Sequence, residues 1–200
     1  MGAKRGMSMR IVGGKFKGRP IAAPAGRETR PTSDRAREAL FNVLTHAPWS
    51  SGIEGARVLD LFAGSGALGL EAMSRGAAFA LFVDTDPAAR GAVRDNIEAL
   101  GLFGVTRTHC RDATDLGARP AGLGEPFNLV FADPPYGKSL GEAALAGLAL
   151  GNWIGSDAII VFECSVEETP ATPDFETLDE RVYGAAKILF LSWTAGVLAG

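Results

Sequence analysis

The segment LDLFAGSGALGLEA, residues 59–72, constrains the fold of this chain more than any other part of its sequence. An apolar strand runs directly into a glycine-rich loop, and this loop opens a helix expected over 67–75. The spacing matches G-x-G-x-x-G, in which the glycines allow a tight turn and let backbone N–H groups approach a ligand. Asp84 follows Gly64, the first of these glycines, by 20 positions, as a ribose-binding carboxylate should. The segment therefore predicts a nucleotide-binding strand–loop–helix unit.

Strands and helices alternate along most of the chain. Two late strands, at about 175–182 and 186–193, have no helix-length spacer between them, so we expect an antiparallel hairpin there. The pattern predicts an α/β fold with a doubly wound, mostly parallel sheet, whose ligands bind at the carboxyl ends of the strands. The other strands are expected at 57–62, 79–83, 105–109, 127–132 and 158–163, and the other helices at 34–46, 87–100 and 140–150.

Charge divides the chain into a basic N-terminal part and an acidic body. Residues 1–37 carry a net charge of +8 and residues 38–200 a net charge of −11. We expect a disordered leader over 1–8, a small basic hairpin or arm over 9–33, and the α/β domain over 34–200. Such a basic segment indicates a polyanionic partner such as a nucleic acid, the alternative being a solvated tail. The candidate nucleic-acid-binding residues are Arg10, Lys15, Lys17, Arg19, Arg30, Arg35 and Arg37 and, outside this segment, Lys138.

The composition is typical of a cytoplasmic protein. Hydrophobic residues make up 46% of the chain and charged residues 22%, and the longest apolar stretches fall far short of the ~20 residues that span a bilayer. The N-terminus has no apolar signal segment. Cys110, Cys164, His46 and His109 are isolated in the sequence, so we expect buried reduced thiols and no metal site. Each predicted element has an expected place, which favours a monomer.

Two nucleotides are candidates for the glycine loop, NAD and S-adenosylmethionine. Asp60 lies four residues before Gly64, at the end of the first strand. A carboxylate about 6 Å from a pyrophosphate costs about 3 kcal/mol at an effective dielectric near 20, whereas it stabilises a sulfonium by a similar amount. Asp60 therefore favours S-adenosylmethionine, unless its side chain points away and only caps a turn. The candidate cofactor contacts are Asp60, Phe62, Ala63, Gly64, Ser65, Gly66, Asp84, Asp112, Ala113 and Thr32.

The tetrapeptide Asp133-Pro134-Pro135-Tyr136 directly follows the strand expected at 127–132. Its prolines fix φ and remove two N–H donors, which leaves carbonyl acceptors beside a carboxylate and an aromatic ring. An exocyclic amine of a nucleobase fits this set, because two acceptors pull its nitrogen toward tetrahedral geometry while the ring stacks on the base. We therefore predict that these four residues are catalytic, the alternative being a simple turn.

Four segments, in this order, resemble one known family: RIVGGKFKGRPI, RPTSDRAREALFNVL, VLDLFAGSGALGLEAMSRGA and DPPYGK. They resemble the bacterial 16S rRNA guanine-N2 methyltransferases called RsmD, over nearly the whole chain. The resemblance implies a Rossmann-like Class I methyltransferase fold with seven strands and S-adenosylmethionine as methyl donor. It also implies that the acceptor is the N2 amine of a guanosine, at a 966-type position of 16S rRNA in the 30S subunit or a late assembly particle. Many relatives have Glu at the position of Asp84.

Other functions stay open at this point. An adenine-N6 methyltransferase uses the same tetrapeptide, although 200 residues leave no room for the separate target-recognition domain that such enzymes usually have. A dehydrogenase would need a further catalytic domain, and a non-catalytic RNA-binding module would not need the glycine loop and Asp133. The segment around Thr32 and Ser33 has two interpretations. It folds over the methionine end of the cofactor, or Ser33 only caps the helix at 34–46.

Overall fold

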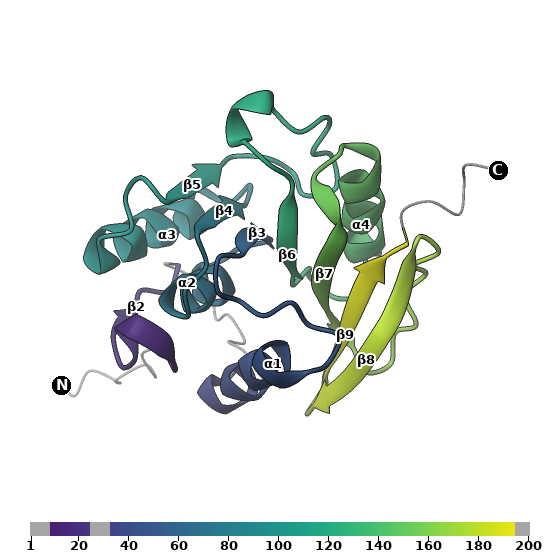
Figure 1. Ribbon diagram of the computed structural model, residues 1–200, viewed down its shortest axis with the longest axis horizontal. Helices are drawn as coiled ribbons and strands as arrows, with labels where there is room; N and C mark the ends of the chain where they lie inside the picture. Colours follow the sequence, from purple (N-terminus) through teal and green to yellow (C-terminus); the bar gives the residue numbers. More distant parts are fainter. Residues whose placement is uncertain (1–8, 25–32, 195–200) are drawn as a thin grey trace.

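A seven-stranded sheet forms the centre of the computed structural model, which describes residues 9–24 and 33–194 (Figure 1). Its spatial order is β5-β4-β3-β6-β7-β9-β8. Neighbouring strands from β5 to β7 run parallel, and β9 runs antiparallel to both β7 and β8. This confirms the mostly parallel sheet with an antiparallel C-terminal hairpin. The strands are β3 (Arg57–Leu61), β4 (Phe79–Val83), β5 (Thr106–His109), β6 (Phe127–Ala132), β7 (Ile154–Ser165), β8 (Phe175–Tyr183) and β9 (Ala186–Trp193).

Helices cover both faces of this sheet. Three of them, α1 (Asp34–His46), α2 (Ala67–Ser74) and α3 (Pro87–Leu100), pack on one face, and α4 (Leu140–Leu150) with the short 3-10 helix η2 (Ala121–Leu123) packs on the other. Side chains alternate along a strand, so successive residues pack into two hydrophobic cores on opposite faces of the sheet. Burial on both faces explains why the central parallel strands β3, β4 and β6 are mostly apolar. No helix within the described residues is long and apolar enough to cross a membrane.

Local sequence sets the ends of the helices. Ser33 Oγ accepts the N–H of Ala36 at 3.1 Å, which confirms the predicted cap of α1. Helix α3 begins at Pro87, after the Asp86 cap, and ends at Gly101, which has a left-handed φ of 67°. The largest difference from expectation is β7, which begins at Ile154 rather than at residue 158. This extension pairs with β6 across an irregularity in the register.

The N-terminal segment is a hairpin anchored to helix α2 rather than a free arm. Strands β1 (Met9–Arg10) and β2 (Pro20–Ile21) pair, and the 3-10 helix η1 (Gly14–Phe16) lies between them. The N–H of Val12 donates to Glu71 Oε2 at 2.8 Å, and Ile11 is fully buried in the core. The proposed boundary between residues 9–33 and 34–200 therefore does not separate two cores. The leader expected over 1–8 lies outside the described residues.

The structure corrects the prediction that Arg37 contacts RNA, because this side chain is buried beneath the hairpin. It is 1% exposed, and its Nη2 donates to the Arg10 carbonyl and, at 2.8 Å, to Asp34 Oδ1. Its Nε lies 3.9 Å from Glu71 Oε2, and Glu71 is itself fully buried and bonded to Arg75 at 2.8 Å. Removing one member of such a buried cluster leaves an uncompensated charge. Arg37 therefore joins the hairpin to α2.

Gly69, the third glycine of the loop pattern, lies where α2 meets the sheet. A Cβ atom at this position would lie 2.5 Å from Phe82 Cε1 and 3.0 Å from Asp60 Oδ2. The Gly69 N–H also donates to Asp60 Oδ2 at 2.9 Å. The absent side chain therefore lets the helix approach both β3 and β4, which fixes the loop before it.

We predict opposite effects from two Gly→Ala substitutions inside helices. Gly69→Ala should lower the free energy of unfolding by about 1–3 kcal/mol, because Phe82 must move to admit the methyl group. Gly91→Ala in α3 is the matched control, since an added Cβ meets nothing there within 4 Å. It should stabilise the protein by about 0.5–1 kcal/mol through helix propensity. Urea unfolding measures both, and equal effects in the two variants would contradict this packing argument.

Candidate active site

The carboxyl ends of β3, β4 and β6 meet at one edge of the sheet, where the strand order reverses. The chain passes from β3 to β4 on one side, whereas β6 lies on the other side of β3. Leu61 pairs with both Val83 and Ala132, so Asp84 and Asp133 leave the sheet at the same level. Such a switch point is where open α/β sheets form their ligand crevice.

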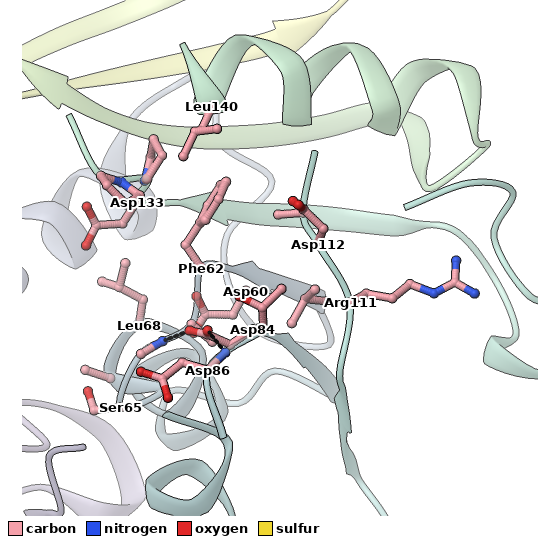
Figure 2. A pocket seen from close by; sticks show the side chains of 18 of the residues that line it. Asp60, Phe62, Ser65, Leu68, Asp84, Asp86, Arg111, Asp112, Asp133 and Leu140 are labelled. Atoms are coloured by element: carbon pink, nitrogen blue, oxygen red, sulfur yellow. Dashed lines mark hydrogen bonds between the residues drawn. The ribbon is translucent and has the colours of Figure 1, made fainter. Parts of the chain in front are cut away.

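A cavity of about 600 Å³ lies at this edge and is called the first cavity below. Figure 2 shows carboxylates from the carboxyl ends of β3, β4, β5 and β6 around it, with Phe62 between Asp133 and Asp112 in this view. Gly66 lies behind this surface as the N-cap of α2, and Thr32 lies outside the described residues. Arg37, a predicted RNA-binding residue, also lines the first cavity. The predicted cofactor-binding and catalytic residues that line it are Asp60, Phe62, Ala63, Gly64, Ser65, Asp84, Asp112, Ala113, Asp133, Pro134 and Pro135.

The turn after β3 has left-handed backbone at three positions. Gly64 and Gly66 have φ values of 56° and 75°, and Phe62 also has a φ of 56°. A bulky residue rarely adopts this conformation, and such strain is concentrated at ligand-binding turns. Gly66 then begins α2, whose first backbone N–H groups have no partner within the helix.

Backbone N–H groups hold two of the carboxylates in place. Asp84 accepts the Gly64 N–H on Oδ2 and the Asp86 N–H on Oδ1, both at 2.9 Å, and Figure 2 marks these bonds. Asp60 accepts the Gly69 N–H on Oδ2. A carboxylate has about four acceptor sites, so these bonds orient each group and leave capacity for a ligand. Asp60 therefore fixes the start of α2 and lines the first cavity at the same time.

The first cavity is strongly acidic. Burial raises the pKa of Asp60 well above its usual range, and the carboxylates of Asp133 and Asp84 raise it further. Burial and the charge of Glu163 raise the pKa of Asp133 to about 8. A cation in the cavity relieves this repulsion, whereas a pyrophosphate adds to it. The electrostatics therefore favour a cationic ligand over NAD.

Asp112 and Ala113 line the cavity after β5. Asp112 Oδ1 accepts the Thr114 hydroxyl at 2.7 Å and the Thr114 N–H at 2.9 Å, and these bonds lower its pKa. Asp112 is therefore a fixed, ionised acceptor at the rim. Arg111 also belongs to the lining, although its side chain extends away from the carboxylates in Figure 2.

A second cavity, of about 940 Å³, lies beyond the tetrapeptide. Asp133, Pro134 and Pro135 line both cavities. Tyr136 lines the second one, and its hydroxyl donates to Glu163 Oε1 at 2.6 Å. The tetrapeptide therefore forms a partition between the two cavities.

The candidate RNA-binding residues, Arg37 excepted, lie mainly on the surface of the hairpin and near the second cavity. Arg10 pairs with Asp34 at 2.9 Å, and Arg19 donates to the Ala99 carbonyl at 2.7 Å. Arg30 lies outside the described residues. The exposed members are Arg10, Lys15, Lys17, Arg19, Arg35 and Lys138, of which Arg35 lines the second cavity.

Sequence reasoning missed two side chains of the second cavity, Glu163 and Tyr183. Glu163 lies near the carboxyl end of β7. An acidic residue at the end of an apolar parallel strand is the sequence signal that could have identified it. Tyr183 has no such signal, because the return of β9 brings the end of β8 to the site. The thiol of Cys110 is exposed, contrary to expectation, and Cys164 is buried. No cluster of three or more potential metal ligands occurs among residues 9–24 and 33–194.

The strand order, the acidic cavity beside a glycine loop and the partition after β6 together define a class I methyltransferase fold. A solved structure of the candidate methyltransferase yhhF from Escherichia coli superposes with a TM-score of 0.77 at 35% identity, covering 94% of this chain and 99% of that one. The family model described as "Conserved hypothetical protein 95" matches residues 9–192.

Two relatives carry a more specific name. Ribosomal RNA small subunit methyltransferase D of Escherichia coli is 39% identical over 82% of this chain and 79% of the relative. The protein of the same name from Haemophilus influenzae is 33% identical over 85% of this chain and 86% of the relative. The chain belongs to this family, RsmD, as its sequence segments indicate.

The raised pKa of Asp133 predicts a dependence of stability on pH. The unfolded chain ionises this group near 3.8, whereas the folded protein keeps its proton up to about 8, so the group's contribution to stability falls as pH rises between these values. Asp133→Asn has no ionisable group at this position and therefore avoids this loss of stability. The free energy of unfolding of the variant, relative to that of the wild type, should rise by ~1 kcal/mol or more between pH 5 and pH 8. Urea unfolding at both pH values measures it, with the exposed Asp95→Asn as control. A pH-independent difference would contradict the raised pKa.

Proposed function

We infer that this protein transfers a methyl group from S-adenosylmethionine to the exocyclic N2 amine of a guanosine in 16S rRNA. The substrate is the 30S subunit or a late assembly particle, at a 966-type position. One observation carries the inference: Asp133, Pro134 and Pro135 line two cavities at once. Transfer between two bound molecules needs two sites with a common wall, so that the reacting atoms meet there. The names of the two relatives support ribosomal RNA as the acceptor.

The first cavity fits S-adenosylmethionine in size and charge. Its volume of about 600 Å³ lies within the usual range for a small-molecule site. Asp84 is placed to accept the ribose hydroxyls, and Asp112 with the Ala113 N–H to receive the adenine. Asp60 and Asp133 face the cationic end, where their mutual repulsion is relieved. Thr32 stays a candidate for the methionine carboxylate, while Ser33 serves as the cap of α1.

The tetrapeptide supplies the chemistry on the acceptor side. S-adenosylmethionine provides an electrophilic methyl group. Asp133 and the Pro134 carbonyl accept the two N2 hydrogens and turn the nitrogen lone pair toward the first cavity. The new N–C bond forms as the S–C bond breaks, and one N2 proton then leaves to solvent. A nearby sulfonium lowers the pKa of Asp133 from about 8, so cofactor binding favours the ionised, accepting form.

The second cavity holds the target base, which must be unstacked to bring its amine to Asp133. Tyr136 provides a ring on which the base stacks. The exposed cations of the hairpin, including Lys15 and Lys17, contact the phosphate backbone. The hairpin therefore provides affinity for RNA, and the tetrapeptide between the two cavities provides the residues that promote methyl transfer.

The direct test is to incubate the protein with labelled S-adenosylmethionine and 30S particles that lack the modification. Digestion and mass spectrometry then identify the labelled nucleoside. N2-methylguanosine is expected. N6-methyladenosine would show instead that the protein is an adenine methyltransferase, and absence of label would contradict methyl transfer to this substrate.

Asp84 and Asp133 should separate cofactor binding from catalysis. Asp84→Ala should weaken S-adenosylmethionine binding by roughly 1.5–3 kcal/mol, through the loss of charged hydrogen bonds to the ribose. Asp133→Ala should lower the single-turnover rate of methylation at least ~100-fold, with a smaller effect on cofactor affinity. Calorimetric titration and rapid-quench methylation of unmodified particles measure the two effects. A fully active Asp133→Ala protein would contradict the mechanism.

The hairpin cations should control the salt dependence of RNA binding. The double substitution of Lys15 and Lys17 by Ala should reduce the slope of log K against log salt by about 1–2, because two phosphate contacts are lost. Cofactor affinity should not change, since neither side chain lines the first cavity. Arg94→Ala, an exposed cation on α3, is the control. Filter binding at several salt concentrations gives the slopes. Equal slopes for the wild type, the double variant and Arg94→Ala would show that the hairpin does not contact RNA.

A further inference from the structure

The second cavity contains an acid that the proposed reaction does not use. Glu163 enters it from β7, which pairs with β6, and Asp133 directly follows β6. Its Oε1 accepts the Tyr136 hydroxyl at 2.6 Å, which fixes the direction of the carboxylate. A carboxylate offers about four acceptor positions, and the Tyr136 bond occupies one of them.

The two acids of this cavity follow residues that pair across β6 and β7, Ala132 with Phe162. Burial raises the pKa values of Asp133 and Tyr136, and the charge of Glu163 raises both further, as does its hydrogen bond to the Tyr136 hydroxyl for Tyr136. A pair of neighbouring acceptors suits a ligand that presents several N–H donors to both groups at once.

Guanine presents donors in this arrangement. Its Watson–Crick edge has the N1–H directly beside the two N2 hydrogens. If Asp133 and the Pro134 carbonyl hold the N2 amine, the N1–H needs a further acceptor next to Asp133. Adenine differs at this point, because the ring nitrogen beside its exocyclic amine is itself an acceptor. A carboxylate opposite that nitrogen would face a lone pair.

We propose that Glu163 accepts the N1–H of the target guanine and so makes the site select guanine over adenine. This inference rests on the proposed function and assigns a specificity-determining residue to it. Tyr136 then has two tasks: its ring stacks on the base, and its hydroxyl aims the Glu163 carboxylate. Tyr183 and Arg35, from β8 and α1, complete the walls of the cavity.

The test compares guanine with 2-aminopurine, which keeps the N2 amine but has no N1–H. Unmodified 30S particles are reconstituted on ligated 16S rRNA that carries either base at the target position. Single-turnover rates are measured with labelled S-adenosylmethionine. The wild type should methylate guanine about 100-fold faster or more, since a site built around an N–H donor rejects an analogue without it. Comparable rates on the two bases would overturn the inference.

Glu163→Gln should reduce this preference at least about 10-fold, because its amide either accepts from guanine N1–H or donates to N1 of 2-aminopurine. Tyr136→Phe is the matched control, since it removes the hydrogen bond between Tyr136 and Glu163 but keeps the carboxylate. It should change the ratio of rates less than about 3-fold. Glu167→Gln controls for the loss of one exposed negative charge nearby.

The outcomes separate the two claims. If Glu163→Gln and Tyr136→Phe slow the methylation of both bases equally, the ratio of the rates on guanine and 2-aminopurine stays unchanged. Glu163 then only positions Tyr136, and the inference fails. Methylation of guanine at N2 by the wild type would still support the proposed function in that case. If the wild type does not form N2-methylguanosine, the proposed function itself fails.

Discussion

The close approach of helix α2 to the sheet, made possible by Gly69, is the contact on which the site depends. Gly69 places its N–H 2.9 Å from Asp60 Oδ2 and leaves no side chain to displace Phe82. With the helix held there, the loop before it must turn sharply, and Gly64 and Gly66 take left-handed conformations. The Gly64 N–H then reaches Asp84 at the end of the next strand. One backbone contact therefore sets the shape of the first cavity.

The clustering of acids at this edge of the sheet lowers the stability of the fold in favour of the function of the site. Asp60 and Asp133 have raised pKa values because they are buried and close to other carboxylates. A structure selected for stability alone would not gather these groups, since each disfavours ionisation of the others. Perturbed titration of this kind is concentrated at functional sites. Under the proposed function, a cationic cofactor on one side of the partition and a donor-rich base on the other would relieve this repulsion.

The sequence predicts those features that depend on short-range patterns. The glycine spacing, the placement of Asp84 and Asp133 after apolar strands, and the Ser33 cap are all visible within a few residues, and the structure agrees with them. Features that depend on distant partners were missed. Arg37 looks like an exposed cation of a helix, yet the hairpin covers it and Glu71 lies beside it. Glu163 meets Tyr136 across 27 residues, a separation that no local pattern encodes.

The tetrapeptide is proposed to be the wall between the cofactor and the base, and a crystal structure with S-adenosylhomocysteine tests this most directly. The ligand should occupy the first cavity, with its ribose hydroxyls on Asp84 and its sulfur facing Asp133 and Pro134. The second cavity should remain open for the base. An adenine ring against Asp133, or a ligand seated in the second cavity beside Tyr136, would contradict the account.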